Sequence, residues 1–341
     1  MSDDLKPSSS IFNKTTLFGS DAIGATAQFL YMFISLLLAG GGNSLVITTI
    51  IRQHQLHSTT YYIQLGLATA NLVFAAVCLP TAMSVVSVAH AGFAGPWCQI
   101  QGSIIFSTGI ASMLLYTISS LDRLICILHP LWYINSCWAN RPYIYIIIII
   151  SSVLVVAIVP LAKQSFNFHE GMMVCTLMST FNYREHTYIS IIGTILFIIC
   201  ILIVSITQIS IFLIARAKIK HIRPWNQSNQ HLMMTLRAHL KALKPTSLTI
   251  LIFVLTWLAY SAMIIVDKKA ENFHNTTQFK ATSRAICLMF MTLPQFCNPF
   301  IYTIYDKKFC DALKRLLNIK SFHTNTQPQP TQYPQEQISR F

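Results

Sequence analysis

Seven long apolar stretches alternate along the chain with short polar segments. A hydrocarbon core about 30 Å thick needs roughly 20 helical residues to cross it, and each stretch reaches that length. They are Ala25–Ile51, Thr60–Val88, Gln99–Leu121, Tyr143–Ala162, Thr187–Ala215, Leu248–Val266 and Thr282–Tyr305. The pattern predicts an all-α fold, a bundle of seven transmembrane helices.

The segments outside the seven stretches complete the predicted domain organisation. Residues 1–24 form an extracellular tail, residues 25–305 the transmembrane domain, residues 306–320 an amphipathic eighth helix and residues 321–341 a disordered cytoplasmic tail. In the short helix, apolar residues recur at helical spacing between Lys and Arg, which is typical of a helix lying on the inner leaflet. The last segment is rich in Gln, Pro and Thr, a composition that does not support a packed core.

The amino-acid composition also indicates a membrane protein. Hydrophobic residues make up 53% of the 341 residues and charged residues only 10%, whereas soluble domains have about 25% charged residues. This balance excludes an ordinary soluble enzyme and, apart from the chain ends, a disordered protein. The net charge of +13 does not indicate nucleic-acid binding, because the basic residues lie between the apolar stretches and do not form one stripe.

The basic residues predict the orientation in the membrane. Two thirds of the 24 Lys and Arg residues fall on the side that carries the C-terminus, and the richer side is expected to be cytoplasmic. Glycosylation sequons at Asn13 and Asn275 fall on the predicted outer side, whereas the sequon at Asn226 falls inside and should be unused. We therefore expect a multi-pass plasma-membrane protein with an extracellular N-terminus, glycosylated at Asn13 and Asn275.

Two of the nine cysteines lie at or beyond the outer surface in this topology. They are Cys98, at the start of the third stretch, and Cys175, between the fourth and the fifth. Because the outside of the cell is oxidising, we expect a disulfide between them. The other cysteines are expected to be small apolar residues, with Cys310 a candidate for palmitoylation. No Cys and His spacing indicates a metal site.

Short motifs stand in a defined order along the predicted helices. Asn298-Pro299-Phe300-Ile301-Tyr302, in the last, is similar to an NPxxY motif, and Asp122-Arg123-Leu124, at the inner end of the third, to a DRY motif with Leu in place of Tyr. Gly42-Asn43, Asn71 and Trp257 stand in the first, second and sixth. With these motifs the chain resembles the rhodopsin-like (class A) G-protein-coupled receptors over about residues 25–320.

The resemblance implies roles for several residues. Those of the switch that couples to a G protein are Asp122, Arg123, Asn298, Pro299, Tyr302 and Trp257. Those of the polar network in the core are Asn43, Asn71, Ser112 and Asn298. Pro299 removes a backbone hydrogen bond from its helix, and we expect the Asn298 side chain to satisfy the freed group. Such a receptor binds an extracellular ligand, signals to a heterotrimeric G protein, catalyses no reaction and needs no cofactor.

Several positions depart from the family pattern. Asn71 stands where the family usually has the Asp of a sodium site, so we expect no strong effect of sodium. The fifth and sixth stretches lack their usual prolines, and His239 stands where some receptors carry an acid that locks the DRY arginine. These departures predict an unusual hinge motion and an unusual resting-state lock.

The outer half of the bundle carries the predicted ligand site. Its candidate residues are Ile105, Phe106, Gly109, Trp257, Tyr260, Arg284 and Leu288. Ile105 stands where amine receptors place an Asp, and no Lys lies between Thr282 and Tyr305 to bind retinal covalently. A mostly apolar pocket favours a small hydrophobic or odorant-like ligand, while peptide ligands stay open. Arg284 either receives an anionic group or lies at the rim with its charge in water.

Two other classes of membrane protein fit the sequence less well. A seven-helix transporter or channel needs polar or ionisable residues along a path through the membrane, and no Asp, Glu, Lys or Arg lies deep in any stretch. An intramembrane enzyme needs a catalytic constellation, and neither paired aspartates nor an H-E-x-x-H motif is present. A receptor that partners with a ligand, membrane lipid and a G protein is the expected function.

Overall fold

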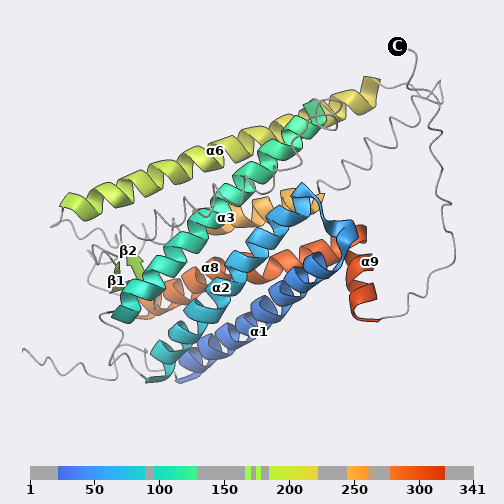
Figure 1. Ribbon diagram of the computed structural model, residues 1–341. Helices are drawn as coiled ribbons and strands as arrows, with labels where there is room; N and C mark the ends of the chain where they lie inside the picture. The colour runs from blue at the N-terminus through green and yellow to red at the C-terminus, as the bar shows by residue number, and fades with distance from the viewer. Residues whose placement is uncertain are drawn as a thin grey trace, which may run out of the picture.

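The computed structural model describes residues 22–88, 96–128, 166–169, 174–177, 184–221, 244–259, 262 and 277–318. Long helices dominate these residues (Figure 1). The elements are α1 (Ala22–Arg52), η1 (His54–Leu56), α2 (Thr59–Val88), α3 (Pro96–Leu128), β1 (Phe166–His169), β2 (Val174–Leu177), α6 (Arg184–His221), the helix Lys244–Ala259, α8 (Thr277–Tyr305) and α9 (Lys307–Leu316). Of the predicted stretches, Tyr143–Ala162 lies outside the described residues, and Leu248–Val266 is described as a continuous helix only to Ala259.

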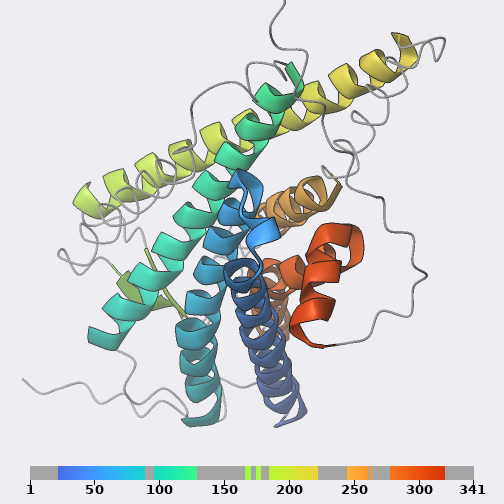
Figure 2. The same cartoon turned by 45° about the vertical axis from the view of Figure 1, so that its right-hand side comes forward.

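The helices pack as neighbours in a bundle. Figure 2 shows α2 between α1 and α3, and α1 also packs against α8 while α3 packs against α6. Among the described residues, the helices long and apolar enough to cross a membrane are α1, α2, α3 and residues 195–214 of α6. Large apolar side chains such as Leu37 on α1 and Ile206 on α6 are exposed, as expected for faces that contact lipid.

Apolar clusters fill the spaces between the helices. One lies between α1 and α2 and includes Met32 and Phe74. A second joins α2, α3, α6 and the helix Lys244–Ala259 around Tyr116 and Phe253. A third joins α1, α2, α8 and α9 around Tyr302. These clusters fix the rotation of each helix and therefore decide which polar side chains meet inside the bundle.

Helices α1 and α8 approach closely at Pro299. A Cβ atom on Gly42 would lie 3.0 Å from the Cβ and Cγ atoms of Pro299, which is closer than most real Cβ contacts, so glycine leaves the ring its space. Pro299 has no N–H for the carbonyl of Gln295 four residues earlier. The Asn43 side chain donates to this carbonyl over 2.8 Å. The expectation that Asn298 satisfies the freed group is therefore wrong, because the nearest donor comes from the adjacent helix.

The sequence did not predict the short hairpin formed by β1 and β2. The two strands pair antiparallel, with Phe168 opposite Cys175. The hairpin packs against the outer end of α3. The hairpin lies in the segment before α6. Its strands have four residues each, too few for an alternating apolar pattern to be recognised in the sequence beside helices of about thirty residues.

The amphipathic helix predicted after the last span is present as α9. Asp306 caps it, since its carboxylate accepts a hydrogen bond from the Phe309 amide over 3.1 Å. Phe309 and Ala312 are buried, and α9 packs against α1 and α8. Lys307 and Lys308 are exposed. The helix therefore buries its apolar face while its basic residues remain accessible.

Candidate functional site

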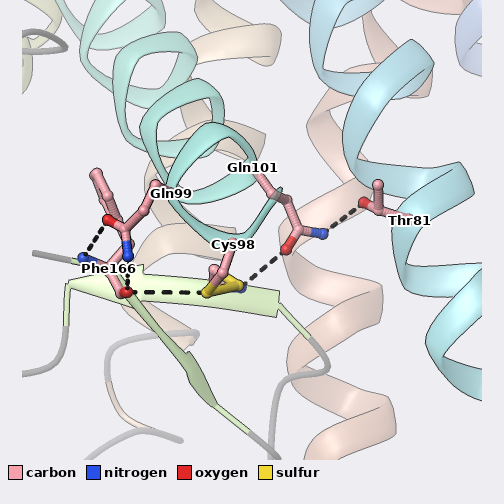
Figure 3. Close-up of a disulfide and its surroundings, with 6 residues drawn as sticks. Thr81, Cys98, Gln99, Gln101 and Phe166 are labelled. Carbon is pink, nitrogen blue, oxygen red and sulfur yellow. Dashed lines mark hydrogen bonds between the residues drawn. A yellow bond between two sulfur atoms is a disulfide. The ribbon is translucent and has the colours of Figure 1, made fainter. Parts of the chain in front are cut away.

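A disulfide joins Cys98 at the outer end of α3 to Cys175 in β2 (Figure 3). Their Cα atoms lie 5.3 Å apart and 77 positions separate them in the sequence. Both cysteines and Phe166 are buried in one small cluster, against which Phe106 packs. The rings of Phe106 and Phe166 meet edge to face at 6.4 Å. The hairpin therefore lies directly beside one of the predicted ligand-site residues.

The structure places only part of the predicted ligand site. Ile105 and Phe106 are half-buried on α3, and Ile105 packs against the cluster between α1 and α2. Gly109 faces the indole of Trp257, whose ring atoms would lie 3.3 Å from a Cβ on Gly109. The predicted residues that lie outside the described residues or side chains are Tyr260, Arg284 and Leu288.

A series of aromatic rings continues inward from Trp257. Trp257 contacts Phe197 of α6 at 5.4 Å and Phe253 at 5.8 Å, measured between ring centroids. Phe253 in turn contacts Tyr116 of α3 at 4.8 Å. The Tyr116 hydroxyl accepts a hydrogen bond from the Asn298 side chain over 3.1 Å. The rings therefore connect Trp257, one of the predicted switch residues, to the NPxxY-like segment, through residues that the motif analysis missed.

The predicted polar residues of the core form two groups among the described residues. Asn71 donates to the Asn43 side chain over 3.4 Å, while Asn298 reaches Tyr116. Ser112 is buried on α3. The side-chain oxygens of Asn298 and Gln295 are buried and accept no hydrogen bond from the described residues. Buried acceptors of this kind are normally met by an ordered water.

The end of the bundle that is predicted to be the inner one holds the DRY-like segment. Asp122 is buried and Arg123 is half-buried. The Arg123 guanidinium donates to the Thr60 hydroxyl, in the first turn of α2, over 2.6 Å. Nothing in the sequence motif pointed to Thr60. The bond fixes the arginine against α2 in this conformation of the protein.

A second polar contact at the inner half joins three helices. Gln208 of α6 donates to the Ser120 hydroxyl of α3 over 3.3 Å. Its side-chain oxygen accepts from the Ser247 hydroxyl, on the helix Lys244–Ala259, over 2.8 Å. We call these three residues the Gln208 bridge. His239, in the predicted lock position, lies outside the described residues.

Tyr302 and α9 form the last part of the inner face. Tyr302 is buried, and its ring meets that of Phe309 at 6.2 Å. The Tyr61 hydroxyl of α2 lies 3.0 Å and 3.2 Å from the two carboxylate oxygens of Asp306. Asp306 thereby caps α9 and links it to α2. The sequence predicted the helix but not this link.

The remaining site predictions are not placed. Asn13 and Asn275 lie outside the described residues. Cys310 is half-buried on α9 with a free thiol. Among the side chains that the structure describes, no group of three His, Cys, Asp or Glu residues is arranged to hold a metal ion.

Comparisons with known proteins agree with this architecture. Residues 42–302 match the family described as 7 transmembrane receptor (rhodopsin family). The chain is 26% identical to trace amine-associated receptor 8b of Mus musculus over 87% of this chain and 89% of that protein. It is 20% identical to the allatostatin-A receptor of Bombyx mori over 81% of this chain and 75% of that protein.

Among solved structures, squid rhodopsin has the same fold. The two superpose with a TM-score of 0.72 at 18% sequence identity, over 86% of this chain and 85% of the rhodopsin chain. This likeness confirms the predicted all-α bundle of seven transmembrane helices. Since the family match covers most of the sequence, the chain belongs to the rhodopsin-like (class A) family of G-protein-coupled receptors, which are multi-pass membrane proteins and not enzymes.

Proposed function

We propose that this receptor binds an extracellular ligand in the outer half of its bundle and signals to a heterotrimeric G protein at its cytoplasmic face. The observation that carries the proposal is the unbroken series of contacts from Gly109 and Trp257, through Phe253 and Tyr116, to Asn298. A ligand that displaces the Trp257 indole can shift the inner half of the bundle through these contacts, because close-packed interiors switch between discrete arrangements.

The ligand is a small hydrophobic or odorant-like molecule. The described part of the site is apolar, with Ile105, Phe106 and Trp257 on its walls and Phe166 beside it. Although a trace amine-associated receptor is among the relatives, Ile105 supplies no carboxylate to pair with an ammonium group. An apolar site without that charge favours an uncharged ligand.

The G protein docks at the inner face, where Arg123 lies. The Arg123 guanidinium donates to the Thr60 hydroxyl, and a guanidinium released from this contact has five donors for carbonyl groups of a partner. The segment between α6 and the helix Lys244–Ala259 adds further basic residues, among them Arg223 and Arg237. Exposed Lys307 and Lys308 on α9 face anionic lipid of the inner leaflet.

The proposed orientation puts the N-terminus outside the plasma membrane and the C-terminus in the cytoplasm. The disulfide between Cys98 and Cys175 supports this assignment, because disulfides persist on the oxidising side of the membrane. The excess of basic residues at the other face agrees with it. Glycosylation at Asn13 and Asn275 belongs to the same proposal.

A second-messenger panel with a library of small hydrophobic compounds tests the proposed function. Cells expressing the full chain are compared with cells expressing Arg123→Ala at equal surface density, and Arg52→Ala serves as the matched control because Arg52 is exposed at the end of α1. We expect Arg123→Ala to lower the ligand response at least about tenfold, since a loss of about 1.4 kcal/mol in coupling corresponds to that factor. An equal response of Arg123→Ala and the wild type would contradict the proposal.

A further inference from the structure

We propose that Gln99 and Gln101 form a clamp that holds the outer hairpin on α3 and α2 independently of the Cys98–Cys175 disulfide. Figure 3 shows the two glutamines on either side of the disulfide, one directed at β1 and the other at β2. The clamp concerns the position of the hairpin, so its test does not depend on signalling to a G protein. Gln99 and Gln101 are positioning residues in this proposal.

Gln99 pairs with both backbone groups of one residue. Its side-chain nitrogen donates to the Phe166 carbonyl over 2.6 Å, and its side-chain oxygen accepts from the Phe166 amide over 3.1 Å. A primary amide offers one donor and one acceptor side by side, as a peptide unit of a neighbouring strand does. Gln99 therefore satisfies both backbone groups of Phe166 at the start of β1, where the Cys98 sulfur also lies 3.8 Å from the Phe166 carbonyl oxygen.

Gln101 ties the second strand to another helix. Its side-chain oxygen accepts from the Cys175 amide over 3.1 Å, and its nitrogen donates to the Thr81 hydroxyl of α2. Gln101 is only 1% exposed. Because water does not compete at such a buried position, and an unpaired amide there is costly, these bonds favour one position of β2.

Gly102 of α3 provides a third contact with the hairpin. Phe166 is 1% exposed and its ring lies over Gly102. A Cβ atom on Gly102 would overlap the Phe166 ring, which no side chain tolerates. The absence of a side chain at position 102 thus provides the space for Phe166. The sequence Gln99-x-Gln101-Gly102 combines two amide anchors with this space on one turn of α3.

The three bonds from the glutamine side chains to the hairpin are strong enough to act without the disulfide. One neutral hydrogen bond typically shifts the equilibrium between the attached and the detached hairpin by about fivefold. Three such bonds shift it by about a hundredfold before the burial of Phe166 is added. The disulfide closes a loop of 77 positions and acts mainly on the unfolded chain. Loss of the disulfide should therefore lower the stability of the whole protein while the hairpin stays in its position on α3.

Amide hydrogen exchange at positions 166 and 175 tests the clamp, because these two N–H groups are bonded to the glutamines. The full chain in lipid nanodiscs is compared with Cys98→Ser/Cys175→Ser, with Gln99→Leu/Gln101→Leu and with the combination of all four substitutions. Gln64→Leu is the matched control, since Gln64 is buried on α2 and its side-chain oxygen has no hydrogen bond from the described residues. Reduction of the folded wild type with a phosphine replaces the cysteine variant if that variant does not fold.

Opening the disulfide should change exchange at both positions by less than about threefold, while the midpoint of thermal unfolding falls. The glutamine variant should accelerate exchange at both positions by about tenfold or more with the disulfide intact, and Gln64→Leu should change neither. Full loss of protection on opening the disulfide alone would overturn the proposal. Unchanged exchange in the glutamine variant would overturn it equally.

Discussion

Gly42 and Asn43, adjacent on α1, accommodate the proline that interrupts α8. Gly42 leaves space for the Pro299 ring, and Asn43 bonds the carbonyl that Pro299 leaves without a donor. Both contacts depend on single atoms, namely an absent Cβ and one amide nitrogen. Inside a transmembrane bundle, neighbouring helices, hydroxyl side chains and ordered waters can satisfy a freed carbonyl, and here the donor is Asn43 of the neighbouring helix. Small residues at helix contacts serve the same close approach.

The glycine contact gives a prediction with a control one residue away. Gly42→Val should destabilise the receptor by about 1–3 kcal/mol, because its side chain overlaps the Pro299 ring. Gly41→Val adds the same side chain where no atom lies within 4 Å of the new Cβ, so it should have little effect. Thermal unfolding of both variants in detergent measures the difference, and equal midpoints would show that α1 and α8 do not touch at this position.

At the level of elements, the Gln208 bridge joins helices that lack the hinge prolines and the acidic lock residue usual in the family. α6 contains no proline, and the helix Lys244–Ala259 has Pro245 in its first turn and no proline further along, while position 239 carries a histidine in place of an acid. The bridge joins both helices to α3 through neutral groups. It provides the contact that an outward movement of the helix Lys244–Ala259 has to break.

Loss of this bridge should raise ligand-independent signalling of the proposed receptor. Gln208→Leu removes both hydrogen bonds, each worth about 1 kcal/mol, and should increase basal second-messenger production about fivefold or more at equal surface density. Thr207→Val is the control, since the Thr207 hydroxyl bonds the carbonyls of Ile203 and Val204 in its own helix. Basal activity equal to that of the control would mean that the bridge does not restrain the resting state.

The start of α9 depends on Asp306 in two ways, as its cap and as the acceptor for Tyr61. Asp306→Ala should loosen α9 by about 1–2 kcal/mol, since a lost cap typically costs about that much. Amide exchange over Lys307–Leu316 should then accelerate by about fivefold to thirtyfold. Asp311→Ala, an exposed position on the same helix, should leave exchange in the first turn unchanged. Similar exchange in both variants would exclude Asp306 as the anchor of α9.

The elements were more predictable from the sequence than the contacts between them. Length and apolar composition alone located α1, α2, α3, α6 and α8, with the ends of α3 and α6 placed six to seven residues too early, because a membrane span needs a fixed number of residues. The partners of Arg123, Gln99 and Gln208 were not predictable. Successive residues on a helix point about 100° apart, so an inter-helix contact depends on rotations that only tertiary packing fixes.

At the scale of the whole molecule, the family and the fold are established by the match over residues 42–302 and by the likeness to squid rhodopsin. The proposed function assigns one end of this bundle to the ligand and the other end to the G protein. The disulfide and the hairpin mark one end, and Arg123, the Gln208 bridge and α9 mark the other. A signal can cross only if these two ends face opposite sides of the plasma membrane.

Antibody access to tags at the two termini of intact cells measures that requirement directly. We expect a tag before residue 1 to be labelled without permeabilisation, and a tag after residue 341 only after the membrane is opened, because the chain crosses the bilayer an odd number of times. Labelling of both tags on the same side of intact cells would contradict the proposed transmission from an outer ligand to an inner G protein.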